Sequence, residues 1–403
     1  MPKTGSPEEP RPRIVLYSHD TLGFGHLRRN IMLASRLREL PSRPDILLLA
    51  GMREAGSFNL PAGIDLITLP AYAKQSDGRY APRHLGLDLK ALATIRENTI
   101  MAAVLSFRPD LFIVDNVPRG AQNELDTTLR MLRETGGTRV VLGLRDVIDR
   151  RDKVRGQWVK QRNFTAVSEW YDEVWIYGAQ DFYDLIAEYD MGPIIHDKAR
   201  FTGYLRRDHA VDPAVSDMIR NQVLHGDSTP YIMTMVGGGR DGLALCKAFA
   251  EARLPEGRRG ILVTGSQMSP RDARIVSDIA RDNHRLTVID FLSETIALID
   301  GAERFIGMGG YNTVCEVLSL NKDALIVPRA TPRAEQLIRA ERLAGLGLID
   351  MLHPDEISAD RLTVWMGRPR KASNFPSPIN MDGLENVALF AAQAFAARQS
   401  HAH

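Results

Sequence analysis

The sequence contains only two cysteines in 403 residues, Cys246 and Cys315. Two cysteines cannot supply a disulfide framework or a zinc site built from several thiolates, and such sparing use is typical of a reducing compartment. The chain also lacks a surplus of either charge, because 51 Lys and Arg residues stand against 50 Asp and Glu residues. This balance disfavours a dedicated nucleic-acid-binding protein, which usually carries a basic excess.

Long hydrophobic runs are missing as well. No stretch of about 18 apolar residues occurs, so the sequence predicts no transmembrane helix. The beginning of the chain is polar and rich in proline and has no apolar core of a secretory signal. The ten histidines are scattered, and none is paired on one helix face near a cysteine, so we predict no metal site. We expect a cytoplasmic protein with a disordered lead-in.

Apolar strands alternate with helical segments along the whole chain, which predicts an α/β fold with parallel sheets covered on both faces. We expect strands at 14–17, 45–50, 64–69, 110–114, 139–144, 173–177, 231–236, 260–264, 286–289, 303–307 and 324–327. Helices are expected at 27–40, 91–107, 242–252, 271–282, 293–299, 312–320, 334–345 and 383–398.

The alternating pattern restarts near residue 203, and 403 residues are enough for two domains with a cleft between them. The predicted division has four parts: a lead-in, a first doubly wound domain, a second one, and a linker with a terminal helix. Their ranges are 1–11, 12–202, 203–368 and 369–403.

The first motif with chemical potential follows the first strand and ends in Gly23-Phe24-Gly25-His26. Glycines at the carboxyl edge of a sheet let the backbone approach a ligand, and a helix N-terminus keeps a histidine neutral and able to accept a proton. Leu27 and Arg28 follow where a dinucleotide fingerprint would continue toward its third glycine, so hydride transfer is disfavoured. The alternative is a tight turn in which His26 only packs or caps.

Asp115 ends the strand at 110–114, where substrate and catalytic groups collect in open sheets. It is a candidate for orienting His26, as an acid commonly orients a catalytic imidazole, and Asp20 is a second candidate. The alternative for Asp115 is a helix cap or an ion pair with Arg119.

Three glycine-rich or polar turns follow strands in the second half of the chain. Gly237, Gly238, Gly239 and Arg240 precede a helix and suit a diphosphate, although no Walker lysine follows; the alternative is a plain flexible turn. Gly309, Gly310, Asn312 and Thr313 open another helix, in which Glu316 suits a ribose diol unless Thr313 and Glu316 form a capping box. Arg333, Glu335 and Gln336 start a third helix; the arginine suits phosphate and the pair suits sugar hydroxyls, or the acid caps the helix.

These last three motifs resemble the C-terminal domain of family 28 glycosyltransferases, which include the N-acetylglucosaminyltransferase of peptidoglycan synthesis and the plant galactolipid synthases. The similarity is best over residues 230–350, in the order Gly309-Gly310-x-Asn312-Thr313-x-x-Glu316, the strand 325–328, and Glu335-Gln336. In the first half it rests mainly on Gly23-x-Gly25-His26, and the longer segment 18–30 looks like a bacterial subgroup of predicted transferases.

The resemblance implies a GT-B fold, in which two Rossmann-like domains face each other across a cleft. It implies that the second domain binds a nucleotide sugar, most often a UDP-sugar, without a metal or other cofactor. Glu316 would bind the ribose, Glu335 and Gln336 the sugar, and Phe291 and Leu292 the base, while His26 would be the general base. The 383–398 helix would cross back onto the first domain. The Glu-Gln pair, where the peptidoglycan enzyme has two glutamines, leaves the donor sugar open.

Together these observations predict an inverting glycosyltransferase that uses a nucleotide sugar and an unidentified acceptor, which is a glycan, a lipid or a small molecule. The alternatives are a hydrolysing UDP-sugar epimerase on the same fold and a non-catalytic nucleotide-sugar-binding protein. The basic segment 145–162 suits peripheral contact with anionic lipid at the inner membrane face, or is a solvated helix with pairs such as Asp149 with Lys153. A long loop at 71–84 is expected beside the acceptor.

Overall fold

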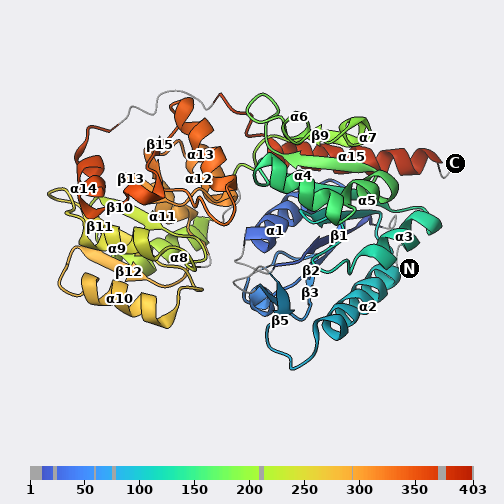
Figure 1. Ribbon diagram of the computed structural model, residues 1–403, viewed down its shortest axis with the longest axis horizontal. Coiled ribbons are helices and arrows are strands. Elements are labelled where there is room, and N and C mark those ends of the chain that lie inside the picture. Colours follow the sequence, from blue (N-terminus) through green and yellow to red (C-terminus); the bar gives the residue numbers. More distant parts are fainter. Residues whose placement is uncertain are drawn as a thin grey trace, which may run out of the picture.

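Two lobes lie side by side in the computed structural model, each built around a parallel sheet (Figure 1). The structure describes residues 11–20, 25–58, 60–74, 79–207, 213–292, 294–370 and 378–401. The predicted α/β class is confirmed, and the predicted strands lie close to the observed ones. Gly23, predicted as part of the acceptor-side loop, is outside the described residues.

The sheet of the first lobe has the strand order β3-β2-β1-β6-β7-β8-β9, and all its neighbours are parallel. Its strands are β1 (Arg13–Ser18), β2 (Asp45–Ala50), β3 (Ile64–Thr68), β6 (Leu111–Asp115), β7 (Arg139–Arg145), β8 (Glu173–Tyr177) and β9 (Ala199–Phe201). Its helices are α1 (Gly25–Arg38), α2 (Leu89–Phe107), α3 (Asp126–Thr135), α4 (Arg151–Lys160), α5 (Asn163–Trp170), α6 (Leu185–Tyr189) and α7 (Pro193–Lys198).

The second lobe repeats this plan with the parallel order β12-β11-β10-β13-β14-β15. Its strands are β10 (Tyr231–Met235), β11 (Arg259–Val263), β12 (Leu286–Ile289), β13 (Arg304–Gly307), β14 (Ala324–Ile326) and β15 (Asp350–Met351). Its helices are α8 (Pro213–Leu224), α9 (Leu243–Glu251), α10 (Pro270–Ala280), α11 (Ile296–Gly301), α12 (Tyr311–Ser319), α13 (Glu335–Gly345) and α14 (Ala359–Gly367). Single 3-10 turns lie at η1 (Arg53–Ser57) and η2 (Pro354–Glu356).

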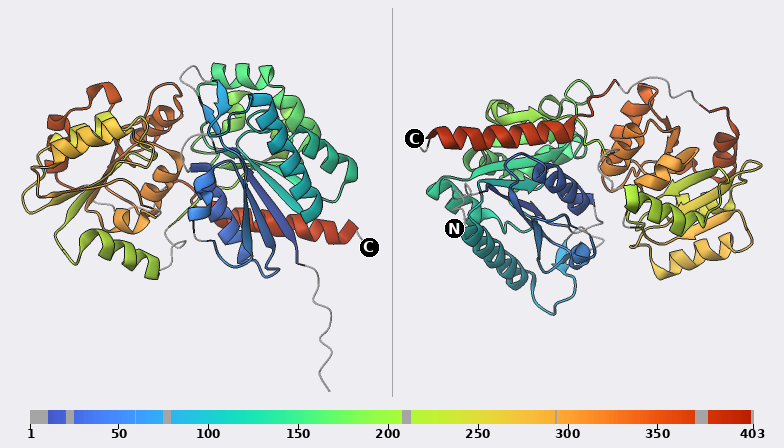
Figure 2. Two further views of the ribbon diagram at one scale, coloured as in Figure 1. Left: turned by 90° about the horizontal axis from the view of Figure 1, so that it is seen from below. Right: turned by 180° about the vertical axis from the view of Figure 1, so that it is seen from behind.

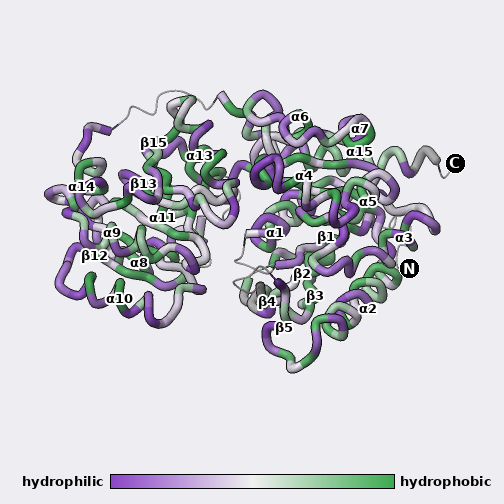
Figure 3. Tube along the Cα trace, viewed as in Figure 1, coloured by the Kyte–Doolittle hydropathy of each residue, from purple (hydrophilic) through white to green (hydrophobic). Residues whose placement is uncertain are grey.

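The strand order reverses once in each sheet, between β1 and β6 in the first lobe and between β10 and β13 in the second. In open parallel sheets a crevice forms at the carboxyl ends of the strands that flank this point. The central strands are apolar and buried, as sheets covered on both faces require. Hydrophilic and hydrophobic stretches alternate along the helices that cover them (Figure 3).

Helix α15 (Gly383–His401) belongs to the packing of the first lobe although it follows the second lobe in the chain (Figure 2). The Phe390 ring meets the edge of Trp175 in β8, with ring centroids 5.8 Å apart, and Arg36 in α1 forms an ion pair with Glu385. The chain therefore crosses between the lobes twice. At the crossing, the Tyr204 amide donates to the Asn380 carbonyl at 2.8 Å and the Gly383 amide donates to the Tyr204 carbonyl at 3.0 Å.

The segment 71–84 is not the structureless loop that its sequence suggested. It contains β4 (Tyr72–Lys74) and β5 (Tyr80–Pro82), which pair antiparallel beside the first sheet. Tyr72 is fully buried and its ring lies 4.4 Å from the Arg96 guanidinium carbon, so this hairpin is anchored to α2. Within the described residues, no helix is long and apolar enough to cross a membrane.

Candidate functional site

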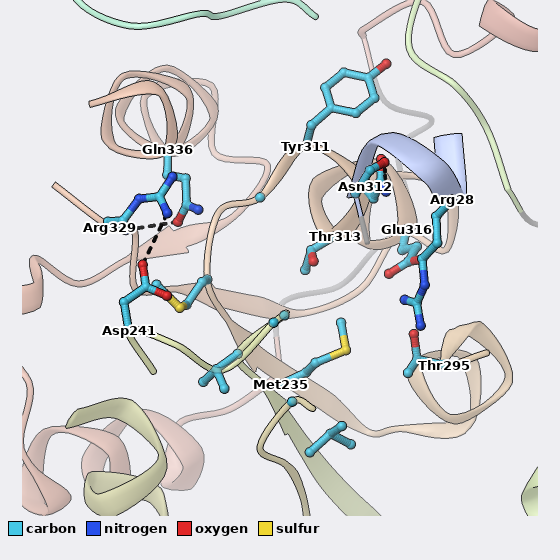
Figure 4. Close-up of a pocket in the computed structure, with 18 of the residues that line it drawn as sticks. Arg28, Met235, Asp241, Thr295, Tyr311, Asn312, Thr313, Glu316, Arg329 and Gln336 are labelled. Atoms are coloured by element: carbon cyan, nitrogen blue, oxygen red, sulfur yellow. Dashed lines mark hydrogen bonds and ion pairs between the residues drawn. The ribbon is translucent and has the colours of Figure 1, made fainter. Parts of the chain in front are cut away.

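A cavity of about 240 Å³ opens between the lobes at the carboxyl ends of both sheets. The first lobe contributes the start of α1 and the end of β7, and the second lobe contributes the turns that follow its strands. Figure 4 shows the second-lobe side of the cavity, with Arg28 of α1 extending across it toward Thr295 and Glu316. The lobes also meet directly here, because Asn312 Nδ2 donates to the Gly25 carbonyl at 3.1 Å.

His26 and Asp115 come together at the first-lobe edge of this cavity. His26 Nδ1 contacts Asp115 Oδ2, and the carboxylate also accepts from Arg29 Nε at 2.9 Å. Arg29 lies one turn after His26 on α1, so both side chains leave the same helix face. His26 lines the cavity, so its second ring nitrogen, Nε2, is available to a ligand there.

Asp115 is completely buried, and its carboxylate contacts both Arg29 and His26. Burial alone raises the pKa of its carboxyl, but the charges of Arg29 and His26 and their hydrogen bonds outweigh this effect and hold its pKa well below the usual range. The alternative pairing with Arg119 is wrong, since Arg119 binds Asp126. Asp115 is therefore a permanent carboxylate that fixes the orientation of the imidazole.

Asp20 does not orient His26. Its Oδ1 accepts from the Leu27 amide at 3.1 Å, so it satisfies a free donor in the first turn of α1. A second imidazole lies beside His26, because the ring of buried His19 is 4.9 Å from that of His26. Burial, together with the neighbouring His26, lowers the pKa of His19 well below its usual range. His19 was part of the sequence motif but gave no signal that set it apart.

The triple-glycine turn, Gly237 to Gly239 after β10, lies against the turn at Thr264 and Gly265 that follows β11. A Cβ on Gly239, whose φ is +90°, would be 2.1 Å from the Thr264 carbonyl oxygen, and one on Gly265 would be 2.4 Å from that of Gly237. The two turns thus touch backbone to backbone. Gly237 and Gly238 line the cavity, whereas Gly239 packs behind them and Arg240 is exposed outside the lining.

Gly239→Ala should lower the free energy of unfolding by more than about 2 kcal/mol, because it adds a backbone clash to a left-handed φ. The matched control is Gly237→Ala, whose φ of +64° is also left-handed but whose Cβ would meet nothing within 4 Å. It should cost about 1 kcal/mol. Urea denaturation followed by circular dichroism measures both. Equal losses would show that the contact between the two turns is unimportant.

The turn before α12 places Gly310, Asn312, Thr313 and Glu316 in the lining, while Gly309 lies behind it with its carbonyl accepting from Arg339. The capping-box alternative is wrong, because Gly310 is the N-cap of α12 and Thr313 lies inside the helix. The buried Glu316 side chain instead accepts from Arg207. Burial raises the pKa of Glu316, although Arg207 opposes this.

At the start of α13, Glu335 and Gln336 both line the cavity, and Arg333 does not. Arg329 holds the pair, since it contacts Glu335 Oε1 and its amide donates to Gln336 Oε1 at 3.0 Å. Arg329 also reaches Asp241 at 3.2 Å, which connects this turn to the triple-glycine turn (Figure 4). Phe291 and Leu292 also line the cavity.

Several lining residues were not singled out from the sequence. Arg28 and Arg29 sit in the motif next to His26, and their helical spacing was the available signal. The remaining lining residues had no sequence signal, because sequence spacing does not show which turns meet. They include Arg145, Asp241, Gly265, Ser266, Thr295 and Arg329. Within the described residues, no three His, Cys, Asp or Glu side chains are grouped so that they could hold a metal ion.

No protein-family model and no curated protein match the sequence. Solved structures do match along nearly the whole chain. The calicheamicin glycosyltransferase CalG4 is 13% identical with a TM-score of 0.60, covering 97% of this chain and 99% of its own. UDP-GlcNAc 2-epimerase from Neisseria meningitidis, solved with UDP-GlcNAc, is 14% identical with a TM-score of 0.58, covering 95% and 99%. MurG from Acinetobacter baumannii is 15% identical with a TM-score of 0.52, covering 95% of both chains. The chain therefore has the GT-B fold.

Proposed function

We propose that this protein is an inverting glycosyltransferase that moves a sugar from a UDP-sugar to an acceptor hydroxyl without a metal ion. One observation carries the proposal: a histidine oriented by a buried carboxylate lines one side of the cavity, and glycine-rich turns and helix N-termini of the second lobe line the other. The neighbour CalG4, whose fold this chain shares, is a glycosyltransferase, which supports the proposal.

The donor lies on the second lobe in this proposal. The amides of Gly237 and Gly238 and the N-terminus of α12 face the diphosphate, where the helix dipole favours negative charge. Glu316 accepts from the ribose diol, and Phe291 contacts the base. Glu335 and Gln336 accept from and donate to the hydroxyls of the sugar.

The acceptor hydroxyl lies beside His26. Its proton passes to the second ring nitrogen of His26 while Asp115 stabilises the imidazolium that forms. The oxygen attacks the anomeric carbon from the face opposite the diphosphate, so the configuration inverts. The diphosphate leaves with the electron pair of the broken bond, and backbone amides stabilise its charge.

The basic segment 145–162 gives little support to membrane contact. Asp149 does not pair with Lys153; its Oδ1 accepts from the Ala334 amide at 2.9 Å, and Lys153 Nζ donates to the Pro332 carbonyl at 3.1 Å. Both side chains thus bridge to the second lobe. Arg155 is also engaged, because it binds the Tyr189 carbonyl at 3.0 Å.

Titration calorimetry with UDP tests the donor site. UDP should bind equally in EDTA and in Mg²⁺, and Glu316→Gln should weaken it about ten-fold or more, since a charge-assisted hydrogen bond to the ribose is lost. The matched control is Glu341→Gln on the exposed face of α13, which should bind like the unaltered protein. UDP binding that needs Mg²⁺, or UDP affinity that is unchanged in Glu316→Gln, would contradict the proposed site.

The epimerase on the same fold makes a different product. Incubation of the protein with UDP-GlcNAc would release a free sugar inverted at carbon 2 if it were a hydrolysing epimerase. A transferase releases UDP and leaves the configuration at carbon 2 unchanged. Tight UDP-sugar binding with no turnover across a broad acceptor panel would instead indicate a non-catalytic binding protein.

A further inference from the structure

Arg145, at the end of β7, lines the cavity from the first lobe. Its Nε is buried without a partner, and none of the hydrogen bonds or ion pairs among the described residues involves this side chain. Burial lowers the pKa of the guanidinium to about 10. Arg145 is partly buried, and an arginine largely removed from water is normally paired, because an unpaired charge there destabilises the fold.

Glu335 faces the same cavity from the second lobe and is also incompletely satisfied. It is 3% exposed, and while Oε1 binds Arg329, Oε2 is buried without a partner. Among the neighbouring charges, Glu335 has the largest effect on Arg145, yet the two side chains form no ion pair. An unsatisfied donor and an unsatisfied acceptor therefore share one corner of the cavity.

The other charges near this corner do not neutralise Arg145. Arg29 is held by Asp115 and Arg339 by Asp146, both through buried ion pairs. Arg29, Arg339 and Arg333 all act on Arg145 as like charges. Arg145 is thus left without an ion-pair partner where the sugar is proposed to lie, which favours an anionic oxygen from a ligand.

We propose that Arg145 is a specificity-determining residue that binds a carboxylate or phosphate group of one substrate, with Glu335 Oε2 accepting from an adjacent hydroxyl. This rests on the proposed glycosyl transfer. A glycosyl transition state carries positive charge on the sugar ring, so a bare guanidinium beside it would oppose the reaction. An anionic group on the substrate cancels that charge and pairs with Arg145, while a neighbouring hydroxyl donates to Glu335 Oε2.

The anion has two sources with the same chemistry. It is either the carboxylate of a uronic acid in the donor or an anionic group of the acceptor, because Arg145 lines the cavity between the lobes. Calorimetric titrations with UDP, UDP-glucose and UDP-glucuronate test the first source, using the unaltered chain, Arg145→Gln, and Arg150→Gln as a matched exposed control. Thermal melting checks that each variant is folded.

For a donor uronate, UDP-glucuronate should bind at least about 30-fold more tightly than UDP-glucose, the range for a buried charge pair. Arg145→Gln should remove this preference while UDP itself binds unchanged, and Arg150→Gln should keep it. Because the variant removes an unpaired charge, its melting temperature should equal or exceed that of the unaltered chain.

For an anionic acceptor, the two UDP-sugars bind alike, and inorganic phosphate or glycerol phosphate binds the UDP-saturated protein only when Arg145 is present. Either pattern supports the proposal. If UDP binds but no probe distinguishes Arg145→Gln from the unaltered chain, the assignment of Arg145 is overturned and the proposed function stands. If UDP does not bind at all, both fall.

Discussion

Alanine in place of His26 should lower turnover by about 10²–10⁴-fold, the usual contribution of a positioned general base. UDP affinity should be largely unchanged, because the donor groups belong to the second lobe. Turnover is measured as UDP release from a UDP-sugar, with water as the acceptor where no better one is known. Near-normal release would contradict the role of His26.

His19 provides the matched control, since its ring lies beside that of His26 but its Nδ1 is buried without a partner. His19→Gln should retain far more activity than His26→Ala. Asp115→Asn should lower turnover with little change in UDP affinity, because an amide does not hold the imidazole in the tautomer that accepts a proton toward the cavity. A His19 variant as inactive as the His26 variant would place the base elsewhere.

The largest expected loss of stability follows from breaking the ion pair between Asp146 and Arg339, which joins the lobes and is completely buried on both sides. Arg339 Nε lies 2.7 Å from Asp146 Oδ2, and Tyr204 also donates to this carboxylate. Burial lowers the pKa of Arg339, but Asp146 raises it by more. Arg339→Met should cost about 3–5 kcal/mol in the free energy of unfolding, because it leaves an uncompensated buried carboxylate.

Two comparisons make this prediction specific. Arg342→Met removes the next cross-lobe pair on the same helix, with Glu188, whose side chains are both 39% exposed. It should cost less than about 1 kcal/mol, as exposed pairs do. The double variant Asp146→Leu, Arg339→Met should regain much of the loss, since no charge is left buried. Urea denaturation measures all three, and equal effects of Arg339→Met and Arg342→Met would refute the argument.

The fold could be predicted to a large extent because runs such as 45–50 and 173–177 are continuously apolar and each is followed by a turn and a helix. The elements that were not predicted depend on tertiary contacts. The hairpin at 72–74 and 80–82 has no alternating pattern of its own and is held by packing of Tyr72 on Arg96. The two-residue strand β15 is similarly defined by its neighbour β14.

The site could be predicted where one turn carries its own signal, as the glycines near 237 and 309 do. The pairing of Asp115 with His26, 89 residues apart, was predicted because both follow strands at the same edge of the sheet, but the sequence could not decide between Asp115 and Asp20 as the partner. No sequence pattern indicated that Arg207 would form an ion pair with Glu316, or that the Arg145 side chain would have no partner. These are properties of neighbouring turns and not of any one motif.

The position of α15 has a consequence for biosynthesis. The residues of this helix that are fully buried, Val387 and Ala391, close the core of the first lobe, yet the ribosome makes them after the entire second sheet. Domains generally fold in the order in which they emerge, but here the lobe that begins the chain cannot be completed first. The second lobe can finish folding while the first still exposes the groove that α15 covers. A nascent chain halted before residue 383 should therefore hold a folded second lobe beside an incomplete first one.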